Sequence, residues 1–486
     1  MSALVLVVFA GAALYFRAYL PYHQVFSGDE VKFTGPDAYY HMRLVDNLIH
    51  HFPLRINFDP YTYFPQGTIE FWPPFYDWLI AGIALLIGLG PPTERVISTV
   101  GAWVPVVLGL LTVIPVYIIG KELFNRWVGV LAASLLLVLP GRFLADSILG
   151  AADHHVAEAL FSTTAVMFLV LAIKTAQQRG LELGNLRRRD WNTLRMPLVY
   201  AMLAGLSLGV YLLTWVGGLM FVLLVFLFFV VQMVIEHLNN RPLDHLAIIG
   251  PVLILVTALI CVPVVSKLSS SGRLWLPSLT VAFLTPMAMT ALSRLMRSRN
   301  LRAAYYPLAV AGLGMLAILV ISLVNPTLFQ SAVHRLGIFT PGAASQTIME
   351  VKPLLFPNGT FSLSYPWLQF NTSFFLSLIS LGTLIFLAIK KGEASKLILI
   401  LWSLFILAAT LGQTRFVYYF GVNVALLTGF VAWQILKYFE FSETPVIKSG
   451  PPGKAPRKKT RNDTARRTSF RLTARRAFMT CGVLVV

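Results

Sequence analysis

Long apolar runs separated by short polar connections dominate the chain. The first run covers about Ala3 to Leu20. Further runs begin near Val96, Trp127, Val156, Met196, Val216, Leu246, Leu276, Tyr306, Asn371, Leu397 and Val417. A helix of about twenty apolar residues crosses the hydrocarbon core of a bilayer, and the pattern contains about twelve such runs. We therefore predict an all-α polytopic membrane protein.

Two segments interrupt this pattern because they are too polar to cross a membrane. The first extends from about residue 22 to 78 and is rich in acidic and aromatic side chains. The second, from about residue 324 to 370, is polar and rich in proline. Connections of this length inside a compact fold usually have a function of their own. We predict that both are structured loops.

The basic residues predict the orientation of the helices. Three connections are rich in positive charge and alternate correctly with the apolar runs: they contain Arg187, Arg188 and Arg189, then Arg294, Arg297 and Arg299, then Lys390, Lys391 and Lys396. Basic connections remain in the cytoplasm. The two long loops and the segment around Asp153 then share the external face, and we predict a protein of the cell membrane.

The basic composition does not indicate a nucleic-acid partner. The chain has 486 residues, of which 57% are hydrophobic and only 12% charged, and its net charge is +18. Much of that charge lies in residues 441–476, which we interpret as a cytoplasmic linker after a membrane domain covering residues 1–440. Residues 477–486 are apolar but too few to cross a bilayer. We interpret them as the start of a final span that is cut off.

The strongest candidate for a metal site is the segment Asp153-His154-His155, with Glu158 one helical turn later. Carboxylates and neutral imidazoles are ordinary ligands for divalent metals. Ionisable groups beside a membrane are also costly and usually functional. The alternative is a polar helix start, with Asp153 capping backbone N–H groups and the histidines at the headgroup level.

Other external motifs allow both structural and functional interpretations. Asp37 could cap a turn or line a site, and the pair Thr347 and Glu350 fits a capping box. Arg415 stands at the outer end of a span, against the usual charge bias, where it would suit an anionic ligand such as a phosphate. The Trp215 segment is interpreted as structural.

Taken together, these motifs resemble the catalytic subunit of oligosaccharyltransferase, the STT3/AglB/PglB family, in its archaeal-type form. The resemblance covers nearly the whole chain, with the motifs of Asp37, Asp153, Trp215, Glu350 and Arg415 in the family's order. It implies the GT-C fold, a helical membrane domain with two catalytic external loops. The implied reaction transfers an oligosaccharide from a polyprenyl phosphate or diphosphate to the Asn of an Asn-x-Ser/Thr sequon.

The resemblance also implies roles for individual residues. Asp37 and Glu350 would hold the acceptor amide and twist it out of conjugation, and Asp37, Asp153 and His155 would bind Mn²⁺ or Mg²⁺, with Zn²⁺ as an alternative. Arg415 would bind the donor phosphate, and attack would invert the anomeric carbon. Supporting roles would fall to the following residues: His154, Glu158, Thr347 and Trp215. The implied partners are the lipid-linked donor, a sequon peptide or protein and membrane lipid, with the enzyme working as a single subunit.

Two departures from the family pattern stand out. The position seven residues before Asp153, usually Arg, is Asp146, with Arg142 nearby. The Trp-Trp-Asp-Tyr-Gly motif, which reads the sequon in the family's soluble C-terminal domain, occurs nowhere. We therefore expect this chain to lack that domain. Two other functions stay open: a GT-C transferase that acts on a lipid or hydroxyl acceptor, and a polyprenyl-lipid transporter.

Overall fold

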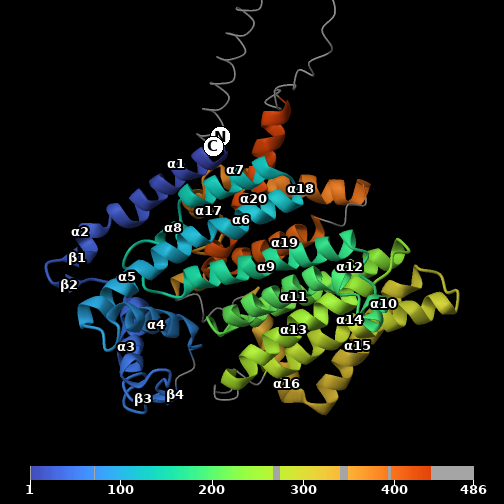
Figure 1. Cartoon of the computed structure of the whole chain (residues 1–486), viewed down its shortest axis with the longest axis horizontal. Coiled ribbons are helices and arrows are strands. Elements are labelled where there is room, and N and C mark those ends of the chain that lie inside the picture. The colour runs from blue at the N-terminus through green and yellow to red at the C-terminus, as the bar shows by residue number, and fades with distance from the viewer. Residues whose placement is uncertain (1, 70–71, 266–273, 340–347, 392–395, 439–486) are drawn as a thin grey trace, which may run out of the picture.

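The computed structural model describes residues 2–69, 72–265, 274–339, 348–391 and 396–438 (Figure 1). Thr347, the basic linker predicted for residues 441–476 and the apolar residues 477–486 lie outside these ranges. Within them most of the chain is helical, and the helices pack side by side in one bundle. The predicted all-α polytopic fold is confirmed.

The first half of the chain holds the N-terminal helix, the first loop and the following apolar helices. Their bounds are α1 Ser2–Leu14, which continues as a π-helix Tyr15–Tyr19, α2 Tyr22–Val25, α3 Pro36–His51, α4 Phe75–Gly88, α5 Glu94–Leu111, α6 Val113–Leu123, α7 Arg126–Val138, α8 Arg142–Ala145, α9 His155–Gln178, α10 Leu183–Arg188 and α11 Trp191–Leu212. Two antiparallel ribbons lie within the first loop: β1 Phe26–Ser27 with β2 Glu30–Val31, and β3 Phe58–Asp59 with β4 Thr68–Ile69.

The second half continues the bundle and contains the second loop. Its helices are α12 Leu219–Leu238, α13 Asp244–Val265, α14 Trp275–Ser298, α15 Tyr305–Val324, α16 Pro326–Arg335, α17 Ser364–Phe370, α18 Ser373–Lys391, α19 Leu397–Gly412 and α20 Val417–Tyr438. Short 3-10 turns at Leu336–Ile338, Met349–Val351 and Thr414–Phe416 connect them.

Among the described residues, ten helices are long and apolar enough to cross a membrane. Two of the twelve expected spans are shorter: the run near Trp127 forms α7, with 13 residues, and the run near Leu397 forms α19, with 16. Pro140 follows the end of α7, and the residue before a proline disfavours the helical conformation. The backbone of Leu139 is accordingly non-helical there, with ψ 123°.

Polar side chains set the starts of several helices. The side chain of Asn125 accepts hydrogen bonds from the N–H groups of Trp127 and Val128 and so caps α7. Asn325 caps α16 in the same way, followed by Pro326 at the first helical position. The second loop therefore begins with a helix that its sequence specifies locally.

The first loop is folded against the bundle. Buried residues of α3 and α4, including Val45, Leu48 and Ile80, form one apolar cluster with α5 and the start of α9. Arg43 of α3 also binds the buried Asp59 with both guanidinium N–H groups, at 2.9 Å each. This bidentate pair, with further hydrogen bonds, holds the pKa of Asp59 well below its usual range. The prediction that this loop is structured is confirmed, and the folding brings α3 to the start of α9.

Candidate active site

The turn before α9 is held in place by two different parts of the chain. Gly150 has a φ of +83°, and a Cβ added there would come within 2.9 Å of Val25, so only glycine fits easily. Its N–H donates to the carbonyl of Ala102, and its carbonyl accepts from the N–H of Thr34. The turn that carries Asp153 is thus fixed to α5 and to the chain just before α3.

Asp153, His154, His155 and Glu158 form one cluster at the start of α9. Asp153 Oδ1 lies 2.7 Å from His154 Nδ1, and Asp153 Oδ2 lies 3.3 Å from His155 Nε2. Glu158 Oε1 lies 3.0 Å from His155 Nδ1. Asp153 also accepts from the backbone N–H of the adjacent His154. His154, not Asp153, is the N-cap residue of α9, and no side chain caps this helix start, so the alternative of Asp153 as a helix cap is wrong. The fully buried Glu158 belongs to the cluster and not to a solvated helix face.

The structure adds His41 and Asp77, to which the sequence assigned no role. His41 Nδ1 lies 2.7 Å from Asp77 Oδ1, and its Nε2 lies 3.1 Å from His154 Nδ1 and 3.6 Å from Asp153. Arg55 in turn pairs with Asp77 at 3.0 Å. A carboxylate that orients a histidine toward a site is typical of metal sites. One feature of the sequence could have indicated that His41 belongs to the site: it lies one helical turn after Asp37, on the same face of the helix.

Neighbouring charged groups shift the pKa values of His41 and Asp153. Burial alone lowers the pKa of His41, but Asp77 and Asp153 outweigh it and raise this pKa to about 9. Burial alone raises the pKa of Asp153, but His155 and His154 outweigh that effect and hold it well below its usual range. Both shifts reflect carboxylates and imidazoles crowded together away from water.

Two groups in the described part of the chain have ligand atoms close enough to hold a metal ion. One is His41, Asp153 and His154, and the other is His154, His155 and Glu158, each with its atoms within 4.8 Å of one another. Asp37 belongs to neither group and lies exposed in the first turn of α3, four residues before His41. The assignment of Asp37 as a ligand stays a prediction.

Glu158 joins this cluster to α20. Its Oε2 accepts hydrogen bonds from the hydroxyl groups of Tyr418, at 2.9 Å, and Tyr419. The Tyr419 hydroxyl lies 2.8 Å from that of Tyr211 on α11. The chain just before Tyr418 carries Arg415, so the start of α20 is tied to the cluster through Glu158.

Arg415 lies in the Thr414–Phe416 turn, beside the turn that carries Glu350. Thr414 donates its N–H to the carbonyl of Lys352 and its hydroxyl to that of Met349. The Arg415 Nε is buried without a hydrogen-bond partner in the described part of the chain. Trp215 lies beside this turn, with its ring 6.1 Å from that of Phe416. A cation with an unused buried N–H is suited to an anionic ligand.

Glu350 lies against Arg142 of α8. Arg142 donates from Nη2 to Glu350 Oε1 at 2.6 Å and from Nε to Asp146 at 2.8 Å. Burial alone raises the pKa of Glu350, but Arg142, and then His155 and Arg415, lower it below its ordinary value. Residue 146, where the family pattern has an arginine, is an aspartate in this chain, and Arg142 lies one helical turn earlier. Thr347 lies outside the described residues.

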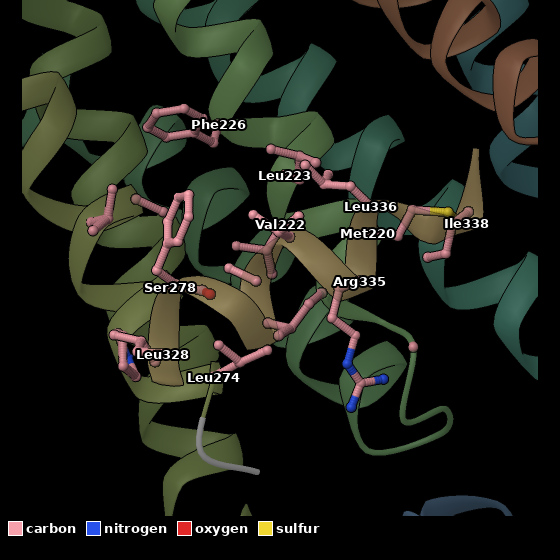
Figure 2. A pocket seen from close by; sticks show the side chains of 18 of the residues that line it. Met220, Val222, Leu223, Phe226, Leu274, Ser278, Leu328, Arg335, Leu336 and Ile338 are labelled. Atoms are coloured by element: carbon pink, nitrogen blue, oxygen red, sulfur yellow. The ribbon is translucent and has the colours of Figure 1, made fainter. Parts of the chain in front are cut away.

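An apolar cavity of about 430 Å³ opens beside this site, between α12, α14, α15, α16 and α19. Figure 2 shows side chains such as Val222, Leu223 and Leu274 pointing into it. The side chain of Arg335, the only charged residue among the described residues of the lining, extends away from the apolar wall in the same view. Gln413 donates to the carbonyl of Gly337, which connects the cavity wall to the Arg415 segment.

Comparisons with known proteins agree with this arrangement. Residues 2–443 match the family described as Oligosaccharyl transferase STT3, N-terminal. The chain is 33% identical over 380 residues to the dolichyl-monophosphooligosaccharide–protein glycotransferase AglB of Haloferax volcanii, covering 75% of this chain and 36% of that protein. It is 30% identical over 448 residues to dolichyl-phosphooligosaccharide-protein glycotransferase 3 of Archaeoglobus fulgidus, covering 87% of this chain and 49% of that protein.

A solved structure has the same fold. The oligosaccharyltransferase AglB from Archaeoglobus fulgidus, in complex with an inhibitory peptide and a dolichol-phosphate, matches with a TM-score of 0.80 at 28% identity, covering 90% of this chain and 51% of that one. The chain spans about half the length of these relatives, or less. On the family match over residues 2–443, this membrane protein belongs to the STT3 family of oligosaccharyltransferases.

Proposed function

We propose that this chain transfers an oligosaccharide from a polyprenyl phosphate or diphosphate to the Asn of an Asn-x-Ser/Thr sequon. The observation that carries the proposal is the meeting of three segments: the Asp153 cluster, the Arg415 turn and the Glu350 turn. Glu158 and Tyr418 connect the first two, and Thr414 connects the last two. The names of the relatives above, which are glycotransferases acting on dolichyl-linked donors, support the same reaction.

Glu350 and Asp37 hold the acceptor in this proposal. An amide nitrogen is a poor nucleophile because its lone pair is conjugated with the carbonyl. Two carboxylates that each accept an N–H bond would twist the amide and release that lone pair. Arg142 binds Glu350 Oε1, which keeps the carboxylate ionised and leaves Oε2 as the oxygen that turns to the acceptor.

A divalent metal fits the donor set at the start of α9, since carboxylate oxygens and imidazole nitrogens lie within 4.8 Å of one another. Asp153, His155 and Asp37 would hold the ion, with His154 and Glu158 in support. When bound, it would stabilise negative charge on the leaving phosphate as a Lewis acid. Mn²⁺ or Mg²⁺ suits these ligands, and Zn²⁺ is the alternative.

The donor binds at Arg415 and in the apolar cavity. The Arg415 guanidinium would bind phosphate oxygens, which suit its planar set of donors. The polyprenyl chain would lie along the apolar cavity, whose described lining residues are apolar apart from Ser278 and Arg335. Nucleophilic attack by the acceptor nitrogen on the face opposite the phosphate inverts the anomeric carbon.

The reaction takes place at the external face of the cell membrane, on a catalytic domain of residues 1–440 that works as a single subunit. Residues 441–476 are the cytoplasmic linker in this proposal. The uneven distribution of Arg and Lys among the connections supports this orientation. A cysteine introduced at Glu94, at the start of α5, reports it: a membrane-impermeant thiol reagent added to whole cells would label an external residue and leave a cytoplasmic one unlabelled.

The test is glycan transfer from a lipid-linked donor to a fluorescent sequon peptide, using the whole chain in lipid nanodiscs. We expect transfer that stops in excess EDTA, returns with Mn²⁺ and falls at least a hundredfold in Asp37→Asn and Glu350→Gln. Transfer that continues in EDTA would remove the metal from the mechanism. Transfer to a lipid or hydroxyl acceptor, with none to the peptide, would identify a different GT-C transferase.

A further inference from the structure

A group of polar side chains meets at the opposite end of α9 from the candidate active site. It consists of Gln232 and Glu236 of α12 and His245 of α13, with Gln177 of α9 beside them, and we call it the Glu236 group. Gln177 is the last residue but one of α9. A helix of this length rises about 35 Å. The Glu236 group is therefore separate from the candidate active site.

The three residues from α12 and α13 are buried in the bundle. Gln232 and Glu236 are each 2% exposed and His245 is 6% exposed. Gln232 and Glu236 are four residues apart and so lie on the same face of α12. Glu236 is the one acidic side chain of this helix, which is apolar enough to cross a membrane. An ionisable side chain inside such a helix is costly and usually functional.

The carboxylate of Glu236 is surrounded by neutral donors. Its Oε1 accepts from Nε2 of Gln232 at 2.8 Å and from Nε2 of Gln177 at 3.5 Å. His245 Nε2 lies 3.7 Å from the same oxygen, and in the described part of the chain no Lys or Arg forms an ion pair with Glu236. A buried charge without an opposite charge beside it is strongly destabilising. The Glu236 group therefore lacks a positive charge.

Two atoms of the group also lack a partner. Gln232 Oε1 and His245 Nε2 are buried without a hydrogen bond in the described part of the chain, whereas nearly all buried polar atoms in proteins have one. Carboxylate and amide oxygens and imidazole nitrogens are ordinary metal ligands. Zn²⁺ binds such atoms at about 2.0–2.2 Å, so two ligands of a tetrahedral ion lie about 3.4 Å apart. The 3.7 Å between Glu236 Oε1 and His245 Nε2 is close to this spacing.

The neighbouring ionisable residues have partners of their own. His237, which follows Glu236, lies with its Nδ1 2.7 Å from the hydroxyl of Ser293, and its ring stacks on that of Tyr306 with centroids 3.9 Å apart. Asp244, which precedes His245, is paired with an arginine of α14 at 2.9 Å. The unsatisfied atoms therefore belong to Glu236's own neighbours and are not shared with these contacts.

We propose that Glu236, His245 and the amide oxygen of Gln232 bind a divalent transition-metal ion such as Zn²⁺. The ion would supply the positive charge that Glu236 lacks and give the two unsatisfied atoms a common partner. This ligand set differs from the two groups at the start of α9, because its third ligand is an amide. Since Gln177 of α9 donates to the same carboxylate, the ion would hold the ends of α9, α12 and α13 together. Its binding is independent of glycan transfer.

The experiment counts the Zn²⁺ ions bound per chain, by equilibrium dialysis of the whole protein in nanodiscs at one fixed concentration of free Zn²⁺, followed by elemental analysis. We expect Glu236→Gln and His245→Gln, tested separately, each to bind one ion fewer than the unchanged protein. The count is a difference, so it does not depend on whether the Asp153 cluster binds Zn²⁺. The same loss of one ion is expected when each change is made in Asp153→Asn.

The matched controls are Glu94→Gln and His23→Gln, which change exposed residues outside the group and should leave the count unchanged. Thermal unfolding in EDTA verifies the fold of each variant. Without metal, Glu236→Gln removes a buried charge that has no cationic partner, so its unfolding temperature should not fall below that of the unchanged protein. An equal count of Zn²⁺ in the unchanged protein and in both variants, or an equal loss in the controls, would overturn the proposal.

Discussion

The hydroxyl of Tyr418 donates to Oε2 of Glu158 over 2.9 Å, across 260 residues of chain. Glu158 is fully buried, and its other oxygen faces His155 at 3.0 Å. One carboxylate therefore connects the candidate metal ligands to the helix that follows Arg415. The distance between the metal and the donor phosphate depends on this contact in the proposed mechanism.

Removing the Tyr418 hydroxyl should weaken this connection. In Tyr418→Phe, a buried charged group loses one hydrogen bond, which costs about 1.5–3 kcal/mol. We expect a lower unfolding temperature in detergent and weaker metal binding, measured by thermal unfolding and Mn²⁺ titration. Tyr305→Phe, at the half-exposed start of α15, is the matched control and should change neither. Identical metal binding in Tyr418→Phe and the unchanged protein would separate Glu158 from the metal site.

The metal site should depend on His41 as well as on Asp153. Groups that orient metal ligands typically contribute 10- to 100-fold to metal affinity. We expect a loss of about that size in His41→Gln, and a larger one in Asp153→Asn, when Mn²⁺ binding is measured by calorimetry. His50→Gln, at the C-terminal end of α3, is the control and should bind normally. A His41→Gln variant with unchanged affinity would show that His41 serves only the packing of the first loop.

The acidic limb of the activity profile should move in Arg142→Gln. Arg142 holds the pKa of Glu350 below its ordinary value of about 4.5, whereas burial raises it. Without Arg142 the burial effect remains, so the pKa rises and Glu350 takes up its proton at higher pH. As the pH is lowered, we expect the variant to lose activity at a higher pH than the unchanged protein does. The transfer rate measured against pH, with unfolding followed in parallel, tests this.

Arg142→Lys keeps the charge and should restore most of the original profile. An acidic limb that stays in place in Arg142→Gln, with the protein folded, would remove Glu350 from the groups that control the rate.

Arg17 should stabilise the turn that leads to Asp153. It is fully buried in the first span and donates to the carbonyl of Leu137 at 2.6 Å and to the hydroxyl of Ser147 at 2.8 Å. Its own carbonyl accepts from the N–H of Leu149. Arg17→Met leaves the first two groups without this donor, which should cost about 1–3 kcal/mol of unfolding free energy. Thermal unfolding measures this, and Arg17→Lys should be intermediate because one ammonium replaces a planar set of donors.

A bulky residue in the apolar cavity should discriminate between donors of different chain length. Ala332 of α16 lines the cavity, so Ala332→Trp should raise the KM for a long polyprenyl donor and leave that for a short-chain analogue nearly unchanged. Ala311→Trp, on the exposed face of α15 and outside the lining, is the control. Equal effects on both donors would place the lipid chain elsewhere.

The sequence by itself determined the class of fold and the position of the candidate chemistry along the chain. Apolar runs of span length are decided by residues close together in sequence, so hydropathy predicted the helices. It failed for α7, where Pro140 shortens the helix, and for α19, which is too short to count as a span. The segment Asp153-His154-His155 was found because its ligand types are adjacent.

Only the tertiary structure decided which distant residues share a site. His41 approaches Asp153 because the first loop folds back onto α5 and α9, and nothing in the sequence near His41 encodes that contact. Arg142 likewise reaches Glu350 across 208 residues. Such contacts depend on how the helices pack, which is a property of the whole buried core, so a local pattern of polar residues cannot specify them.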